Sequence, residues 1–211
     1  MIGAVSAFPL VLGSASPRRR ELLAQLGVKF EVVAGDADES IRLGEPVGSY
    51  LERVVEAKLA NVRDRVATRW PRALVLVADT CVVCGPNVED LLAKPTDRLD
   101  ACRMLELLAG RTHEVWTRFT LGAADGRIWA TELVASAVTF RALSAEEIDA
   151  YVATDEGSDK AGAYAIQGRA GAFVSRIEGS YSGIVGLPLC EVSVALALAG
   201  LSTQTPGVDA V

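Results

Sequence analysis

The sequence predicts an α/β fold built on a mixed β-sheet, and two features of the chain predict it. Segments of strand and helix character alternate in the first half, an order typical of parallel strands joined by helices. Two long strand-like segments joined by a short turn follow in the second half, and they add an antiparallel pair. We find no internal repeat or linker, so we expect one domain over residues 1–211 with a core from about 10 to 199.

The first half alternates short apolar runs with helical segments. Ser16 and Pro17 suit the N-cap and first turn of a helix, and Gly27 ends it. An apolar run without alternation, residues 73–78, predicts a strand covered on both faces that residues 81–84 continue. The expected order is strand 9–13, helix 14–26, strand 30–34, polar loop 35–46, helix 47–67, strand 73–84 and turn 85–87.

The second half begins with a helix that Gly110 ends, followed by the antiparallel pair. Ser144, with Glu147 three residues later, has the pattern of a capping box and predicts a helix start. The expected order is helix 97–109, strands 113–121 and 128–140 around a turn at 124–126, a small-residue segment at 157–171, strand 172–177, tight loop 179–188, helix 189–199 and a frayed tail at 202–211.

Composition and charge exclude several classes of protein. Apolar residues are 50% of the chain and charged residues 23%, which excludes a disordered chain, a collagen and a coiled coil. Acidic residues outnumber basic ones by 27 to 21, so we expect no binding of nucleic acid or membranes through overall charge. The N-terminus lacks a basic region and the last apolar run is short, so we expect no signal peptide, no membrane span and a cytoplasmic protein.

Three arginines, Arg18 to Arg20, occupy the first turn of the predicted helix 14–26. The helix dipole disfavours cations at this end, and the like charges repel one another. An anion bound among the guanidinium groups and free N–H groups would relieve both effects. The alternative is that the arginines extend into solvent or pair with nearby acids such as Glu21.

Lys58 lies near the middle of an apolar stripe on the long predicted helix. The stripe consists of Leu51, Val54, Val55, Leu59, Val62 and Val66. Lysine is rarely buried unless it is paired. Either Lys58 extends past the helix edge into solvent, or it reaches a carboxylate or phosphate at the rim of a cleft.

Asp79 directly follows a buried strand, where open α/β sheets place their ligand sites. The alternative is an aspartate that caps a turn, but the chain continues with strand character, so a functional role is favoured. Lys94 follows the next turn and adds a cation. The small-residue segment carries Asp159, Lys160 and Gln167, and its glycines permit close approach of backbone to a ligand, although a plain surface loop would look similar.

Cys81 and Cys84 have the spacing of a redox or zinc pair, but a second pair is missing and His113 is the single histidine. On a strand, an offset of three directs the two thiols to opposite faces. We therefore predict no metal or redox role for the cysteines, and we expect His113 at the start of a strand rather than in a catalytic triad.

Together these segments resemble the Maf family of nucleoside triphosphate pyrophosphatases over residues 10–199. The matching motifs are SASPRR at 14–19, Asp38-Glu39, Lys58 in EAKLANV, ADT at 78–80, Lys94-Pro95, the His113 motif at 110–117, DKAGAYAIQG at 159–168 and VGLPL at 185–189. The resemblance implies an elongated mixed sheet flanked by helices, related to inosine triphosphatases, with a cleft between two lobes. It also implies a metal-dependent cytoplasmic enzyme, often a homodimer.

The resemblance also implies roles for individual residues. Asp79 is the catalytic carboxylate, and with Glu39 it would hold a divalent cation, Mg2+ or Mn2+. Three positions look like the family branch that acts on dTTP and UTP rather than on 7-methyl-GTP: Arg18, Thr80 and Gln167. The expected phosphate-binding residues are Ser14, Arg18, Arg19, Lys58, Lys94 and Lys160.

The chain departs from the family pattern at Ala93, Ala165 and Gly183, where Gly, Gly and Asn are usual. None of these departures removes a charged site group. Two alternatives to a dTTP and UTP pyrophosphatase stay open: a 7-methyl-GTP pyrophosphatase, and a regulatory nucleotide-binding module linked to cell division. Retention of Asp79 favours turnover, because nucleotide binding alone would not require that acid.

Overall fold

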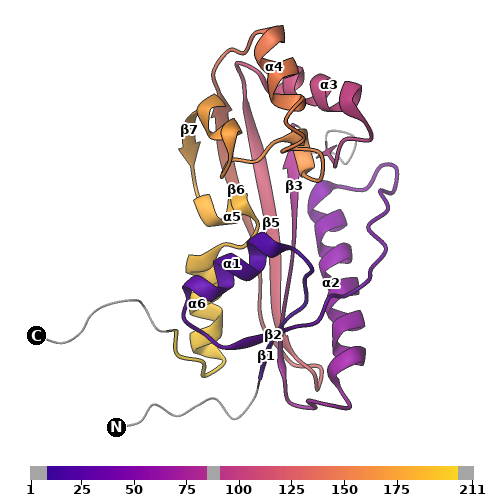
Figure 1. Ribbon diagram of the computed structural model, residues 1–211. Helices are drawn as coiled ribbons and strands as arrows, with labels where there is room; N and C mark the ends of the chain where they lie inside the picture. Colours follow the sequence, from indigo (N-terminus) through magenta and orange to yellow (C-terminus); the bar gives the residue numbers. More distant parts are fainter. Residues whose placement is uncertain (1–8, 85–90, 204–211) are drawn as a thin grey trace, which may run out of the picture.

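The computed structural model describes residues 9–84 and 91–203, and it shows a mixed sheet with helices on both faces (Figure 1). The strand order is β2-β1-β3-β5-β6-β7, and β4 pairs with β3 beside this path. The first three of these strands are parallel, whereas β3, β5, β6 and β7 are successive antiparallel neighbours. The predicted α/β class and mixed sheet are confirmed.

The strands are β1 (Leu10–Leu12), β2 (Phe30–Val32), β3 (Leu74–Val83), β4 (Leu91–Leu92), β5 (Thr112–Ala123), β6 (Ile128–Phe140) and β7 (Val174–Glu178). The helices are α1 (Pro17–Gln25), α2 (Val47–Val66), α3 (Arg98–Leu108), α4 (Ala145–Val152), α5 (Tyr181–Val185) and α6 (Leu189–Leu198). Two short 3-10 helices are η2 (Ala161–Ala163) and η3 (Arg169–Phe173). Among the described residues, no helix is both long enough and apolar enough to cross a membrane.

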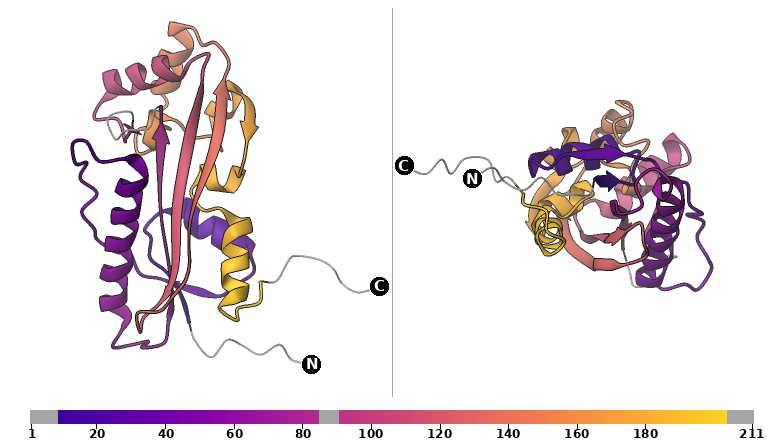
Figure 2. Two further views of the ribbon diagram at one scale, coloured as in Figure 1. Left: turned by 180° about the vertical axis from the view of Figure 1, so that it is seen from behind. Right: turned by 90° about the horizontal axis from the view of Figure 1, so that it is seen from below.

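The long strands β5 and β6 run the length of the molecule and connect two lobes (Figures 1 and 2). The upper lobe in Figure 1 has its own apolar core, in which Leu105 of α3 packs with Phe140 of β6. In the lower lobe, Leu76 and Leu196 belong to a core between the sheet and helices α1 and α6, while Val62 packs α2 on the opposite face. Separate cores on shared strands account for the elongated, two-lobed shape that the family resemblance implied.

Two helix starts form as their sequences predict. Ser16 is the N-cap of α1, and its hydroxyl accepts a hydrogen bond from the Arg19 N–H at 3.4 Å. Ser144 and Glu147 form the predicted capping box at α4. The Arg141 guanidinium, with the Ser144 N–H, lowers the pKa of Glu147 to about 2, so this carboxylate is ionised at neutral pH.

Four short elements were not predicted: β4, α5 and the 3-10 helices η2 and η3, the last of which takes up the first two residues of the strand expected at 172–177. Residues 179–188 were expected to form a tight loop, but they contain α5, whose N-cap Ser180 accepts a hydrogen bond from the Gly183 N–H at 3.0 Å. A five-residue helix is too short to show a 3.6-residue period, and the two-residue strand β4 is too short to show alternation. The expected turn at 85–87 and most of the tail at 202–211 lie outside the described residues.

His113 is buried in β5, near the start of the strand as predicted. Its Nε2 lies 2.9 Å from the Tyr164 hydroxyl, and its ring packs edge-on against Phe140 and Tyr164. Burial disfavours the imidazolium form and lowers the pKa of His113 from 6.5 to about 4. The unfolded chain therefore binds a proton between pH 4 and 6.5 that the folded chain does not.

We predict that His113 makes the protein less stable as the pH falls from 6.5 towards 4. Because the unfolded state binds the extra proton, His113 lowers the free energy of unfolding by about 2 kcal/mol between pH 8 and pH 5. In His113→Gln, urea unfolding at these two pH values should show a difference smaller by about this amount. An identical pH dependence in wild type and variant would contradict the prediction.

Candidate active site

The main cleft opens where β1 ends and β3 continues. The parallel register ends at Leu12 and Leu76, and the Gly13 N–H donates to the Leu76 carbonyl at 2.8 Å. Strand β3 then runs on to Val83 and pairs with β4 only at Val82 and Val83, so its edge is open from Val77 to Cys81. The segments that follow β1 and β2 meet at this edge, the carboxyl end of the parallel strands, where α/β sheets bind ligands.

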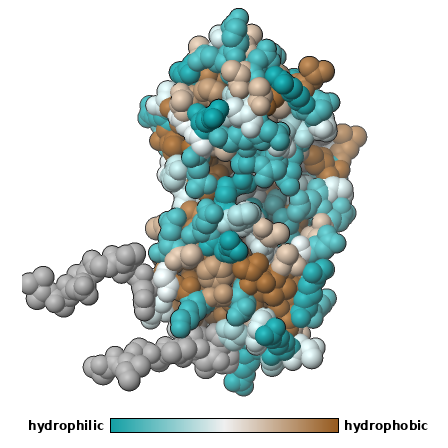
Figure 3. Space-filling model, in the orientation of Figure 1, coloured by the Kyte–Doolittle hydropathy of each residue, from teal (hydrophilic) through white to brown (hydrophobic). Residues whose placement is uncertain are grey.

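The cleft has a volume of about 610 Å³ and is lined by segments from both lobes. Hydrophilic residues gather across the middle of the face shown in Figure 3. The structure brings all the residues implied by the resemblance to this cleft: Ser14, Arg18, Arg19, Glu39, Lys58, Asp79, Thr80, Lys94, Asp159, Lys160 and Gln167.

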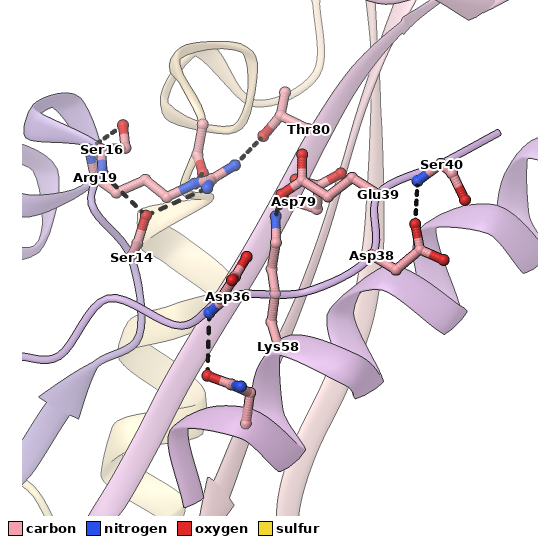
Figure 4. A network of polar contacts seen from close by, with 12 residues as sticks. Ser14, Ser16, Arg19, Asp36, Asp38, Glu39, Ser40, Lys58, Asp79 and Thr80 are labelled. Carbon is pink, nitrogen blue, oxygen red and sulfur yellow. Dashed lines mark hydrogen bonds and ion pairs between the residues drawn. The ribbon is translucent and has the colours of Figure 1, made fainter. Parts of the chain in front are cut away.

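Lys58 forms the centre of the charged cluster. Its Nζ lies 2.7 Å from Asp79 Oδ1 and 2.7 Å from Glu39 Oε1 (Figure 4). Its side chain extends from the buried face of α2 and only 8% of the residue is exposed. Of the two alternatives for this lysine, the one that reaches a carboxylate is confirmed.

Glu39 comes from the loop after β2, and α2 holds this loop in place. The Tyr50 hydroxyl donates to the Glu39 carbonyl at 3.3 Å, and Arg53 Nη2 donates to the Ser40 carbonyl at 3.0 Å. Burial opposes ionisation of Glu39, but the Lys58 ammonium, together with the charges of Lys94 and Arg19, more than offsets it and holds the pKa of Glu39 below its ordinary value. The loop therefore presents an ionised carboxylate to the cleft.

Arg19 is fixed by three hydrogen bonds. Its Nε donates to the Gly186 carbonyl at 2.9 Å, and its two terminal nitrogens donate to Ser14 Oγ at 3.4 Å and Thr80 Oγ1 at 3.2 Å. Burial lowers the pKa of Arg19, while Asp79 opposes this shift. A guanidinium has five N–H groups, so two remain for an anion in the cleft.

Thr80 is part of a directed chain of hydrogen bonds. Thr117 Oγ1 donates to the Gly183 carbonyl at 2.8 Å, so the 2.9 Å contact between the two threonine hydroxyls is donated by Thr80. Thr80 then accepts from Arg19 and orients that guanidinium. Thr117 closes the family motif at 110–117, but sequence reasoning assigned it no role, because the motif does not show that Thr80 lies opposite it on the neighbouring strand.

The remaining polar residues come from the opposite wall of the cleft, except Arg18, which lies beside Arg19 on α1. Lys160 Nζ donates to the Glu156 carbonyl at 2.7 Å and forms an ion pair with Asp159. Within the described part of the chain, no hydrogen bond engages the side chains of Arg18, Lys94 or Gln167. These three side chains are therefore available to a ligand.

The carboxylates of Asp79 and Glu39 suit a hard divalent cation. Across residues 9–84 and 91–203, no group of three or more acidic, histidine or cysteine side chains is arranged to hold a metal alone. Magnesium, however, is usually bound by one or two carboxylates together with substrate phosphates and water. Two carboxylates that already converge on one cationic Nζ fit that arrangement.

Cys81 and Cys84 differ in exposure, and two of the three residues that depart from the family pattern lie in the cleft. Cys81 is buried against α2, where burial and Asp79 raise the pKa of its thiol, whereas Cys84 is exposed. Ala93 and Ala165 line the cleft. Gly183 lies in α5 behind the cleft wall, where a Cβ would come within 3.1 Å of Ser180.

Fold and cleft together define an α/β protein whose cleft presents five cationic side chains and three carboxylates to a ligand, which suits a polyphosphate. The chain belongs to the Maf family: a family model described as "Maf-like protein" matches residues 9–199. This confirms the resemblance found in the sequence.

Curated relatives match most of the chain. The dTTP/UTP pyrophosphatase of Hahella chejuensis is 50% identical over 89% of this chain and 90% of that protein. The proteins of the same name from Myxococcus xanthus and an Anaeromyxobacter species are also 50% identical, over 91% and 95% of this chain and 93% and 95% of their own lengths.

We predict that Lys58→Met raises the pKa of Glu39. Burial favours the neutral acid, and the variant lacks the ammonium that offsets burial in the wild type. Carboxyl-carbon NMR titration measures this pKa directly. Lys29→Met, at an exposed position in the loop before β2, serves as the control and should leave it unchanged. An unaltered Glu39 pKa in Lys58→Met would contradict the electrostatic role of Lys58.

Proposed function

We propose that this protein hydrolyses dTTP and UTP to the monophosphate and pyrophosphate. The observation that carries the proposal is Asp79, an aspartate on an open strand edge, held by Lys58 in a cleft with four further cationic side chains. The names of the relatives support the choice of dTTP and UTP. Arg18, Thr80 and Gln167 also look like the family branch that acts on dTTP and UTP.

The cationic side chains would bind the triphosphate. Arg19 has two N–H groups for a bidentate contact, and its position is set by Ser14, Thr80 and Gly186. Lys94 and Lys160 would supply point charges from the other wall of the cleft. Such preplaced charges stabilise the leaving pyrophosphate as negative charge develops on it.

Asp79 would act on the attacking water. Lys58 binds Oδ1 and so fixes the carboxylate, which leaves Oδ2 to accept a proton from water. The water oxygen bonds to the α-phosphorus, and the bond from that phosphorus to the bridging oxygen breaks. The monophosphate and pyrophosphate leave, and the proton passes to Asp79.

Asp79 and Glu39 would also hold a divalent cation, Mg2+ or Mn2+, which would neutralise charge on the phosphate oxygens. Gln167 would read the base, while Thr80 would act on specificity through Arg19. The proposal places the enzyme in the cytoplasm and retains the homodimer that the resemblance implies. The absence of nucleic-acid binding stays a prediction.

The proposal predicts metal-dependent pyrophosphate release that is highest with dTTP and UTP. The measurement compares these two with CTP, 7-methyl-GTP and the common purine triphosphates, each with Mg2+ or Mn2+ and with chelator. Chelator should abolish release, because the two protein carboxylates would no longer share a cation with the phosphates. Activity on 7-methyl-GTP alone would overturn the specificity, and no release from any nucleotide would overturn the enzyme.

Asp79→Asn should lower kcat for UTP by about 100- to 10,000-fold, the usual contribution of a general base. The amide keeps the shape of the side chain, so nucleotide binding measured by calorimetry should largely persist. Asp125→Asn, in the exposed turn between β5 and β6, is the matched control and should retain full activity. Undiminished turnover in Asp79→Asn would remove this residue from the mechanism.

A further inference from the structure

The loop that carries Gln167 is anchored at both ends by two side chains outside the cleft. At one end the Ala165 N–H donates to the Tyr151 hydroxyl at 3.0 Å, and at the other the Arg169 N–H donates to Glu156 Oε1 at 2.8 Å. The same Glu156 oxygen accepts the Tyr151 hydroxyl at 3.1 Å. One hydrogen-bonded pair, Tyr151–Glu156, therefore binds both ends of the segment 165–169.

The packing around this pair leaves little freedom. A Cβ at Gly168 would lie 2.3–2.5 Å from the three carboxylate atoms of Glu156, so any side chain there would displace that carboxylate from its present position. Tyr151 is 4% exposed, and its ring packs edge-on against Phe173 with centroids 5.2 Å apart. The pair is thus itself held by the core of the upper lobe.

Glu156 also connects the loop to the phosphate-binding wall. Its backbone carbonyl accepts the Lys160 ammonium at 2.7 Å. One residue thereby places a candidate phosphate ligand and one end of the candidate base-reading loop. A shift of Glu156 would move both groups relative to each other.

The loop residues that the pair holds line the cleft, whereas the two residues of the pair do not. Ala165, Gln167 and Lys160 line the cleft, whereas Tyr151 and Glu156 are absent from its lining. Any influence of the pair on catalysis must therefore pass through the loop. This separates a positioning role from direct contact with the nucleotide.

We propose that Tyr151 and Glu156 are positioning residues that set the base selectivity of the enzyme by holding the loop at 165–169. This inference rests on the proposed function, because it concerns selection among nucleotide bases. Small displacements of groups that contact a substrate change rates by up to about 100-fold. The pair therefore affects discrimination between bases as well as rate.

The test compares Tyr151→Phe, Glu156→Ala and Glu156→Gln in the full-length protein. Tyr151→Phe and Glu156→Ala remove the acceptor for one loop end, whereas the Gln oxygen can still accept both hydrogen bonds. Glu147→Ala is the control, because it removes the capping box of α4 and an ion pair with Arg141, at the opposite end of the helix that carries Tyr151, but none of the hydrogen bonds to the loop. Two readouts are needed: amide hydrogen exchange of residues 164–170, and the ratio of kcat/KM for UTP to that for CTP.

Tyr151→Phe and Glu156→Ala should speed amide exchange in this segment and lower the UTP-to-CTP ratio by about tenfold. Glu156→Gln should show the exchange rate and the ratio of the wild type. Unchanged exchange in Glu156→Ala would show that the pair does not hold the loop. Faster amide exchange in the loop with an unchanged UTP-to-CTP ratio would show that the pair does not set selectivity. A fall of the UTP-to-CTP ratio in Glu147→Ala as large as in the test variants would show the same. If the wild type releases no pyrophosphate, the proposed function and the selectivity role fail together, while exchange still decides whether the pair holds the loop.

Discussion

The buried ammonium of Lys58 is the interaction on which the geometry of the cleft depends. It joins helix α2 to Asp79 on β3 and to Glu39 in the loop after β2, with both contacts at 2.7 Å. A buried lysine is stable only when it is paired, and two carboxylates this close need a cation between them. Loss of Lys58 would leave two carboxylates without the cation between them, whereas loss of either carboxylate would leave one paired ammonium and carboxylate. The same pairing orients the carboxylate assigned to the attacking water.

The cleft itself follows from unequal strand lengths. Strand β1 has three residues and β3 has ten, so the edge of β3 becomes free just where the chain turns into α1. Beyond β3 the sheet continues with antiparallel strands, and β5 and β6 extend into the second lobe. The lower lobe supplies Arg19, Lys58 and Asp79, and the upper lobe supplies Lys160 and Gln167. A ligand bound between them would contact both lobes.

The sequence predicted those site and cap residues that stand out by their position in a local pattern. Lys58 interrupts an apolar stripe, Asp79 follows a buried strand, and the capping box at Ser144 has a fixed spacing. Contacts between distant segments were not predictable in this way. Arg19 binds the Gly186 carbonyl across 167 positions, and Thr80 meets its partner on β5 across 37. The pair Tyr151–Glu156 was missed because its role depends on where a later loop returns.

In the proposed reaction, water oriented at Asp79 attacks the α-phosphorus of the nucleotide. The most direct test is hydrolysis of UTP in oxygen-18-labelled water, followed by mass spectrometry of both products. Attack at the α-phosphorus places the label in UMP and leaves pyrophosphate unlabelled. Label in pyrophosphate, or formation of labelled orthophosphate as the first product, would show attack at another phosphorus and would contradict the arrangement described for this cleft.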